Sequence, residues 1–196
     1  WTRAPRMRDT AHPDPALRPA RSRRRPGTGL RSGGRSSPCS WTSSATRSGA
    51  PLSTGAYGTP TVWVEGGTFH LFYERDDKGV WLATSKDLRV WTNVRDEPVL
   101  ALGPEAYDRH AVALNQVVRH RGRYYAVYHA NADPEWKGPW TTCLAASDDL
   151  VRCEKYPGNP VIRSDDSSGI LVDDGQRLRL YTMHPAVKLW LPRGTL

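Results

Sequence analysis

The sequence has little of what defines several large classes of protein. Of its 196 residues only 38% are hydrophobic, and no apolar run approaches the roughly 20 residues of a membrane-spanning helix. The three cysteines, Cys39, Cys143 and Cys153, form no CxxC pair and stand at no metal-ligand spacing from a histidine. The sequence therefore predicts no membrane span, no structural zinc site and no disulfide scaffold. No signal peptide is visible, and because the sequence opens with Trp1 we expect its true start to be missing.

Acidic and bulky residues are nearly missing from residues 1–56. This segment has 11 Arg and no Lys, its only acids are Asp9 and Asp14, and it contains no Val, Ile, Phe or Tyr. The formal net charge of +8 comes wholly from it, so the remainder of the chain is close to neutral. A segment with so little apolar surface cannot offset its conformational entropy, and we expect it to have little stable structure.

Three interpretations of residues 1–56 remain open. The segment is a disordered basic arm that touches nucleic acid or an acidic surface, a linker, or an out-of-frame translation of GC-rich DNA. The abrupt change in composition near Thr54–Tyr57 fits a frame boundary better than a domain boundary. Resequencing of the locus tests this, because one uninterrupted frame would exclude the frameshift.

From Tyr57 onward the sequence repeats a β-hairpin. The stretches "TVWVEGGTFHLFYE" (61–74), "QVVRHRGRYYAVYH" (116–129) and "GILVDDGQRLRLYTMH" (169–184) each contain two apolar strands around a glycine turn. Gly67, Gly122 and Gly175 align, at spacings of 55 and 53 residues. The sequence therefore divides into an unmatched segment, 1–56, and a repetitive domain, 57–196.

The repeat extends beyond the hairpin. A third strand, "GVWLATS" (79–85) or "WTTCLAAS" (140–147), is followed by a Ser-x-Asp-Leu turn and then by Trp91 or Cys153. About four strands in roughly 50 residues is typical of a β-propeller blade, so we expect an all-β fold with about three blades. Trp91 is expected to pack between blades, and Cys153, its counterpart, is expected to leave a gap.

The motifs "SKDLRVW", "YPGNPVI", "GRYYAVYH" and "RLRLYTMH" resemble the five-bladed β-propeller glycosidases. These are glycoside hydrolase family 43 and its relatives in families 32, 68, 117 and 130. The resemblance covers residues 57–196. It implies a glycosidase that hydrolyses oligo- or polysaccharides, by inversion in the usual case for the family. It implies a carbohydrate partner, and secretion or a periplasmic location is compatible with it. We expect no nucleic-acid or membrane partner, and the sequence does not indicate an oligomeric state.

The match to this family is incomplete. Five blades would need about 250 residues at this period, so the sequence shows only part of a propeller. An open stack of blades leaves exposed edges and apolar faces, so the chain is not expected to be stable or active without further blades. No dedicated metal site or cofactor is predicted from "RSDDSS" (163–168) or "VDDGQ" (172–176), which lack EF-hand spacing, although the resemblance allows a structural calcium on the propeller axis.

Glycosidases generally need two carboxyl groups that flank the scissile bond. The resemblance implies that they lie where the innermost strand of each blade begins. Aligned through the hairpin glycines, these positions hold Thr59-Pro60, Leu114-Asn115 and Ser167-Ser168, none of which is acidic. The sequence therefore departs from the family pattern at the positions that matter most for catalysis.

Two carboxylates nearby are the remaining catalytic candidates. "AYDRHAVALNQ" (106–116) brings Asp108 to the approach of an inner strand, as a base or a pKa-tuning acid, or as a loop residue that caps a turn and pairs with Arg109. Glu74 follows its hairpin as a general acid or a hydroxyl-binding group, or as a solvated charge paired with Arg75. We predict Asp108 and Glu74 as the catalytic residues.

The sugar-binding candidates come from the same ends of the strands. They are His110, Asn115, His129, His184, Arg109 and Trp136. For the histidines the alternative is a hydrogen bond to backbone, and for Asn115 it is a partner among neighbouring side chains. Trp136 lies with Trp140 in the loop "DPEWKGPW" (133–140), which would overhang the active face and could stack on a sugar ring.

Two other functions stay open. The first is a catalytically inactive, carbohydrate-binding propeller, favoured by the missing carboxylates at the inner-strand starts. The second is nucleic-acid binding through residues 1–56, against which stand the near-neutral remainder and the lack of aromatic residues among the arginines. Steep salt dependence of DNA binding would support the latter.

Overall fold

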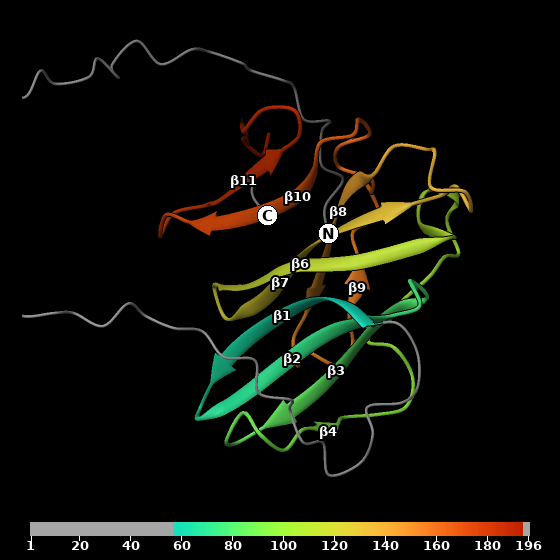
Figure 1. Ribbon diagram of the computed structural model, residues 1–196. Helices are drawn as coiled ribbons and strands as arrows, with labels where there is room; N and C mark the ends of the chain where they lie inside the picture. The colour runs from blue at the N-terminus through green and yellow to red at the C-terminus, as the bar shows by residue number, and fades with distance from the viewer. Residues whose placement is uncertain (1–56, 194–196) are drawn as a thin grey trace, which may run out of the picture. The chain divides into compact units, whose positions relative to one another are not determined.

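The computed structural model describes residues 57–193, and this part of the chain is all-β, as predicted (Figure 1). It holds three antiparallel sheets and one 3₁₀ turn, η1 (Ala106–Asp108). Within this range no helix has the length and apolar character to cross a membrane. The predictions made for residues 1–56 lie outside the described residues, as do residues 194–196.

The first sheet, here called the first blade, has the order β1-β2-β3-β4, with β5 also pairing with β3. Its strands are β1 (Tyr57–Glu65), β2 (Thr68–Arg75), β3 (Gly79–Ser85), β4 (Thr92–Asn93) and β5 (Leu100–Ala101). The predicted turn is confirmed, because Gly66 and Gly67 have φ of 55° and 68°. A two-residue hairpin turn of type I′ needs this left-handed conformation at both positions.

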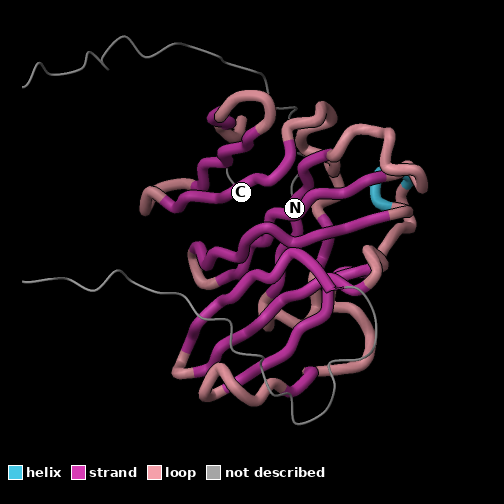
Figure 2. The backbone as a smooth tube through the Cα atoms, in the orientation of Figure 1, coloured by secondary structure: helices cyan, strands magenta, loops and turns pink. Residues whose placement is uncertain are grey.

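The second and third blades repeat the plan, in the orders β6-β7-β8-β9 and β10-β11-β12. Their strands are β6 (Ala111–His120), β7 (Arg123–Asn131), β8 (Thr141–Ser147), β9 (Glu154–Lys155), β10 (Ser167–Asp173), β11 (Leu178–Met183) and β12 (Lys188–Trp190). Gly122 and Gly175 both have φ of 85° in the hairpin turns. Figure 2 shows the three sheets as separate groups of strands, with η1 among the loops at the right-hand edge.

The Ser-x-Asp-Leu motif forms the same turn in both copies. The carboxylates of Asp87 and Asp149 each accept hydrogen bonds from the two backbone N–H groups two and three residues further on, at 2.8–2.9 Å. These bonds lower the pKa of both carboxyls. The hydroxyls of Ser85 and Ser147 accept from the backbone N–H groups of these aspartates, at 3.2 and 3.3 Å. The motif therefore repeats because the third strands of the first and second blades, β3 and β8, end in the same side-chain-capped turn.

The blades pack face to face because each sheet is apolar on both sides. Along β8, Cys143 belongs to the core shared with the first blade, while Leu144 belongs to the core shared with the third. Successive side chains of a strand point to opposite faces, so one short strand serves both interfaces. The second blade is consequently buried on both faces.

The substitution of Cys153 for the repeat's tryptophan has a visible effect on packing. Trp91 is buried with Tyr73 and Trp81 on the face of the first blade that points away from the second. Cys153 lies at the corresponding place on the second blade, facing the first, and lines an apolar cavity of about 10 Å³ with Phe72. The predicted gap is confirmed. Burial raises the pKa of the Cys153 thiol to about 11, so the thiol stays protonated at neutral pH.

The inner strands of the first and third blades, β1 and β10, leave aliphatic side chains in solvent. Val62 and Val64 on β1 are 49% and 53% exposed, and Ile170 and Val172 on β10 are 44% and 41% exposed. In both strands these residues alternate with side chains that face the second blade, such as Trp63 and Leu171. The two uncovered faces are those on which further blades of a propeller would pack.

The cavity beside Cys153 leads to a stability prediction. Cys153→Met should raise the free energy of unfolding by about 1 kcal/mol, because a flexible thioether can fill the gap. Cys143→Met is the matched control. It should lower the free energy of unfolding by about 1–3 kcal/mol, because Cys143 is completely buried in packed surroundings. Urea denaturation of the full chain measures both, and equal losses in the two variants would contradict the assignment of the gap.

Candidate functional site

The inner strand of every blade has a β-bulge near its start. The bulges fall at Thr59-Pro60 in β1, Asn115 in β6 and Ser168-Gly169 in β10. Each bulge includes at least one residue of the pair that alignment of the hairpin glycines selected, and no bulge holds an acidic residue. Thr59 and Ser168 have φ of 46° and 53°, an uncommon conformation for residues other than glycine. Bulges of this kind re-aim side chains next to functional sites.

Glu74, at the end of β2, lies against the first of these bulges. The Thr59 hydroxyl donates a hydrogen bond to Glu74 Oε2 at 3.2 Å, and the side chain of Asp77 is also hydrogen-bonded to Glu74. Burial raises the pKa of Glu74 to about 7, and the hydrogen bond and negative charge of Asp77 add to this, against the opposing effect of Thr59. Glu74 therefore holds a proton close to neutral pH, as a general acid must.

His129 lies across the boundary between the first and second blades from this carboxyl pair. The amide of Asn115 contacts its Nδ1, at 3.0 Å from Nδ2 and 3.2 Å from Oδ1. Burial lowers the pKa of His129 to about 4, although the charge of Asp77 acts in the opposite direction. The imidazole is thus neutral at pH 7, and with Nδ1 accepting from Asn115 it can donate from Nε2 to a ligand.

Two tryptophans from the β7–β8 loop cover this region. The rings of Trp136 and Trp140 stack with centroids 5.2 Å apart, and Trp140 meets His129 edge-on at 4.8 Å. Trp136 also meets His110 edge-on at 5.2 Å and is 41% exposed. The structure therefore brings Trp136, His110, His129 and Asn115 into one cluster, whose exposed ring can receive a flat apolar surface.

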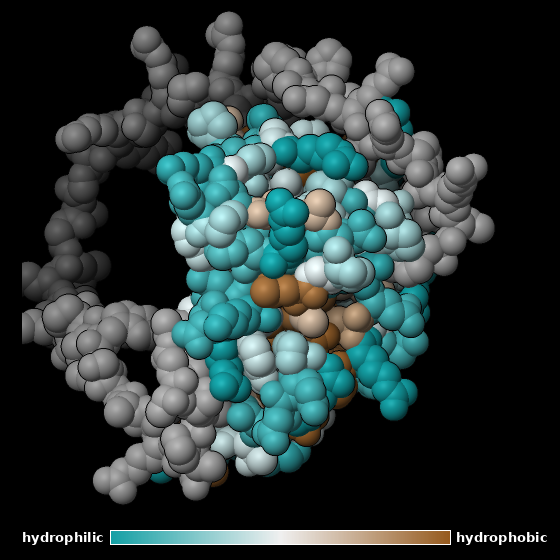
Figure 3. Space-filling view, turned by 90° about the vertical axis from the view of Figure 1, so that its right-hand side faces the viewer, coloured by the Kyte–Doolittle hydropathy of each residue, from teal (hydrophilic) through white to brown (hydrophobic). Residues whose placement is uncertain are grey.

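Local hydrogen bonds hold the tryptophan loop in place. The amide of Asn131 donates to the Gly138 carbonyl at 3.2 Å, and its oxygen accepts from the Asp133 backbone N–H at 2.7 Å. The Asp165 carboxylate, from the loop before the third blade, accepts from the Trp140 backbone N–H at 2.9 Å. Figure 3 faces the side on which these loops lie and shows a largely hydrophilic surface around a small hydrophobic patch.

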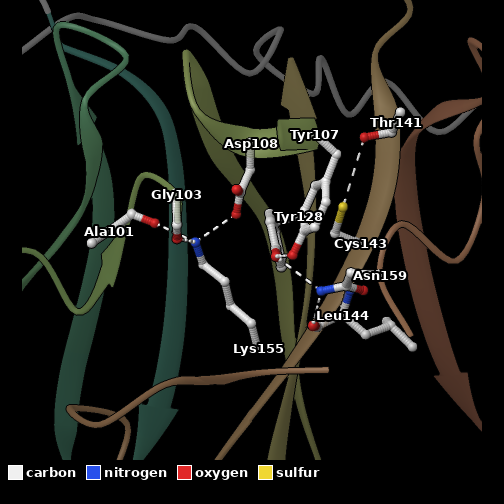
Figure 4. Close-up of polar contacts among 10 residues, drawn as sticks. All are labelled: Ala101, Gly103, Tyr107, Asp108, Tyr128, Thr141, Cys143, Leu144, Lys155 and Asn159. Carbon is white, nitrogen blue, oxygen red and sulfur yellow. Dashed lines mark hydrogen bonds and ion pairs between the residues drawn. The ribbon is translucent and has the colours of Figure 1, made fainter. Parts of the chain in front are cut away.

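Asp108 was predicted to face a substrate, but the structure buries it. Its side chain is completely buried, and its Oδ2 accepts from Lys155 Nζ at 2.5 Å (Figure 4). The same ammonium donates to the carbonyls of Ala101 and Gly103, each at 2.6 Å. Asp108 is therefore paired with Lys155 rather than with Arg109, and neither a sugar nor bulk water reaches it in this conformation.

The two remaining candidates lie apart from the cluster. Arg109 is exposed and donates from Nε to the Ala132 carbonyl at 3.4 Å. His184 is exposed in the β11–β12 loop, with φ of 73°, and no contact joins it to the cluster around His129 within residues 57–193. Among these residues no group of three or more His, Cys, Asp or Glu side chains is arranged to hold a metal ion.

Sequence reasoning missed three residues that shape the site: Asp77, Thr59 and Asp165. Asp77 lies in the turn "ERDDKG", three residues after Glu74. The side chains of Glu74 and Asp77 can meet only because β2 ends at Arg75 and the chain turns there. In the sequence, Thr59 marks only an inner-strand position without a carboxylate, and Asp165 only a stretch, "RSDDSS" (163–168), that lacks EF-hand spacing. Their roles depend on contacts between separate loops.

The Glu74–Asp77 contact predicts two linked pKa changes. In Asp77→Asn the pKa of Glu74 should fall from about 7 towards its ordinary value of 4.5, because a negative neighbour is lost. The pKa of His129 should fall below about 4, because the same charge supports its protonated form. NMR titration of the two side chains measures both. Asp148→Asn, in an exposed turn of the second blade, is the control, and an unchanged Glu74 in Asp77→Asn would contradict the contact.

Comparison with known proteins supports the fold. Neither a protein-family model nor a curated protein matches the chain. A solved thermostable family-43 glycoside hydrolase is 16% identical, with a TM-score of 0.50, and the match covers 67% of this chain and 43% of that one. A glycoside hydrolase-like protein from Bacteroides ovatus is 18% identical, with a TM-score of 0.55, and the match covers 69% of this chain and 46% of that one.

A glycosidase-like protein from Bacteroides thetaiotaomicron is 15% identical, with a TM-score of 0.53, and the match covers 71% of this chain and 50% of that one. The match thus spans half or less of the length of these structures. At such identities the likeness concerns the fold alone. The described part of the chain is therefore a partial β-propeller with the fold of the propeller glycosidases.

Proposed function

We propose that this chain is the acid-donating part of a propeller glycosidase that hydrolyses oligo- or polysaccharides. One observation carries the proposal: Glu74, with its pKa raised to about 7, is hydrogen-bonded to Asp77, whose charge also acts on the neutral His129. His129 in turn contacts Trp140, which stacks on Trp136. Protonation of a bound glycosidic oxygen requires a carboxyl group that still holds its proton near neutral pH, and the surroundings of Glu74 supply this.

The acid step follows from the surroundings of Glu74. Its carboxyl transfers a proton to the leaving oxygen as the bond to the anomeric carbon breaks, and the carboxylate that remains accepts the Thr59 hydroxyl hydrogen bond. The neutral His129 can donate from Nε2 to a sugar hydroxyl, with Asn115 fixing its ring. The exposed ring of Trp136 supplies a stacking surface for a sugar face.

Neither Asp77 nor Asp108 is placed to act as the second catalytic carboxylate. Asp77 is hydrogen-bonded to Glu74, which is closer than the roughly 5–9.5 Å that separates the two carboxyl groups of glycosidases. Asp108 is enclosed with Lys155, which suits it to hold the approach to β6 rather than to activate water. Hydrolysis would thus use a base other than these two carboxylates.

Carbohydrate binding without hydrolysis is the second candidate. The observation that favours it is the absence of a carboxylate at the three inner-strand bulges, where Thr59, Asn115 and Ser168 stand within the described range. Both candidates use the same tryptophan surface. They differ in whether the protonated Glu74 has a catalytic partner.

The first test is of Glu74 as the acid. A panel of p-nitrophenyl glycosides and plant cell-wall oligosaccharides is offered to the full chain. With a hydrolysed substrate, Glu74→Gln should lower kcat about 10²–10⁴-fold, whereas Glu97→Gln, at an exposed residue, should change little. Activity of the unchanged chain should decline above about pH 7, because Glu74 then loses its proton. Oligosaccharide binding with no hydrolysis at any pH would support the second candidate instead.

The second test is of the tryptophan surface. Trp136→Ala should weaken oligosaccharide binding roughly tenfold, since a stacked ring contributes about 1–1.5 kcal/mol, and Trp136→Phe should restore most of the loss. Titration calorimetry measures the affinities. Equal affinity of the Ala variant and the unchanged chain would exclude Trp136 as the sugar platform under either candidate function.

A further inference from the structure

A hollow of about 540 Å³ opens beside the β7–β8 loop, and the residues that line it do not include His110, Asn115, His129 or Trp136. Its volume lies in the range of clefts that bind small molecules, roughly 300–1,000 Å³. Three segments line it: the end of η1 with the residue after it, the β7–β8 loop, and the loop before the third blade. The charged residues in its lining are Arg109, Asp133 and Arg163.

The hollow has an excess of positive charge. Arg109 and Arg163 both line it, one from the approach to the second blade and one from the approach to the third. Arg109 uses Nε for the Ala132 carbonyl, and neither arginine forms an ion pair with any residue in the range 57–193. Asp133, the one acid in the lining, accepts the Glu135 backbone N–H at Oδ1.

The arginines are presented by well-anchored backbone. Arg109 directly follows Asp108, which is completely buried and bound to Lys155. Arg163 follows Ile162, which is buried and whose backbone N–H donates to the Thr142 carbonyl at 3.2 Å. The planar guanidinium group holds its N–H donors in a fixed arrangement. An arginine therefore loses less conformational entropy than a lysine for each hydrogen bond that it forms with a carboxylate.

We propose that this hollow is a subsite for a sugar residue that carries a carboxylate, a uronic acid. Arg109 and Arg163 bind the carboxylate, and Asp133 accepts a hydrogen bond from a ring hydroxyl. The hollow and the tryptophan surface share the loop 133–140, so one oligosaccharide can occupy both, with a neutral or acidic residue on Trp136 and a uronate beside it. This inference rests on the proposed function, because it names the substrate class of the same site.

The chemistry explains why a neutral sugar would bind less well. A ligand that enters the hollow displaces water from two guanidinium groups, and hydroxyl groups replace those hydrogen bonds without balancing the charge. A carboxylate both pairs with the charge and matches the geometry of the guanidinium fork. The subsite therefore binds acidic polysaccharides with higher affinity than neutral ones.

The test compares two ligands of nearly the same shape. The full chain is titrated by calorimetry with trigalacturonic acid and with the same trisaccharide methyl-esterified at its carboxyl groups. The acid should bind at least about tenfold more tightly than the ester at low ionic strength, and the preference should shrink as salt is added. Arg109→Gln and Arg163→Gln should each weaken binding of the acid about five- to tenfold and leave binding of the ester within about twofold.

Arg89→Gln, at an exposed residue of the first blade, is the matched control and should leave both affinities unchanged. All three arginines are exposed, so thermal unfolding of the variants should coincide with that of the unchanged chain. Equal binding of acid and ester, or equal losses in all three variants, would overturn the uronate subsite. If the ester binds and Trp136→Ala weakens that binding, the proposed function survives without the subsite. If neither trisaccharide nor any neutral oligosaccharide binds, both proposals fail.

Discussion

The ammonium group of Lys155 holds together the part of the structure on which the site depends. It reaches from β9 of the second blade to two carbonyls at the end of the first blade and to the buried carboxylate of Asp108. Removing one member of such a pair leaves an uncompensated buried charge, at a cost of about 3–5 kcal/mol. Because Arg109 and His110 follow Asp108 directly, this one cation also sets where the hollow and the tryptophan cluster lie.

The site also depends on contacts between neighbouring blades. Thr61 donates its hydroxyl to the carbonyls of Leu114 and Asn115, at 3.0 and 3.1 Å, and the side chain of Gln116 accepts from the Leu171 backbone N–H at 2.6 Å. These bonds join the three inner strands beside their bulges. The site is thus a property of the boundary between blades, and the apolar faces left open on β1 and β10 are where additional blades would extend it.

Asp108 and Glu74 are both carboxylic acids, but their different surroundings give them different roles. Asp108 is buried beside a cation, which suits it to a structural role. Glu74 is partly buried beside another carboxyl, so its pKa rises to about 7 and it can carry a proton. Sequence reasoning placed the two together as catalytic candidates. It could not separate them, because Lys155 and Asp77 become their partners only through contacts between loops.

The all-β class, the three hairpins with their glycine turns, the repeated Ser-x-Asp-Leu turn and the gap at Cys153 could all be predicted from the order of residues. These features depend on local periodicity and on comparison of one blade with the next, which the chain carries in its order of residues. Three features depend on the packing of loops and blades: Asp108 pairs with Lys155, burial and Asp77 together raise the pKa of Glu74, and Arg109 and Arg163 share a hollow. The distances between these groups and the burial of Glu74 follow from that packing, which no local sequence pattern determines.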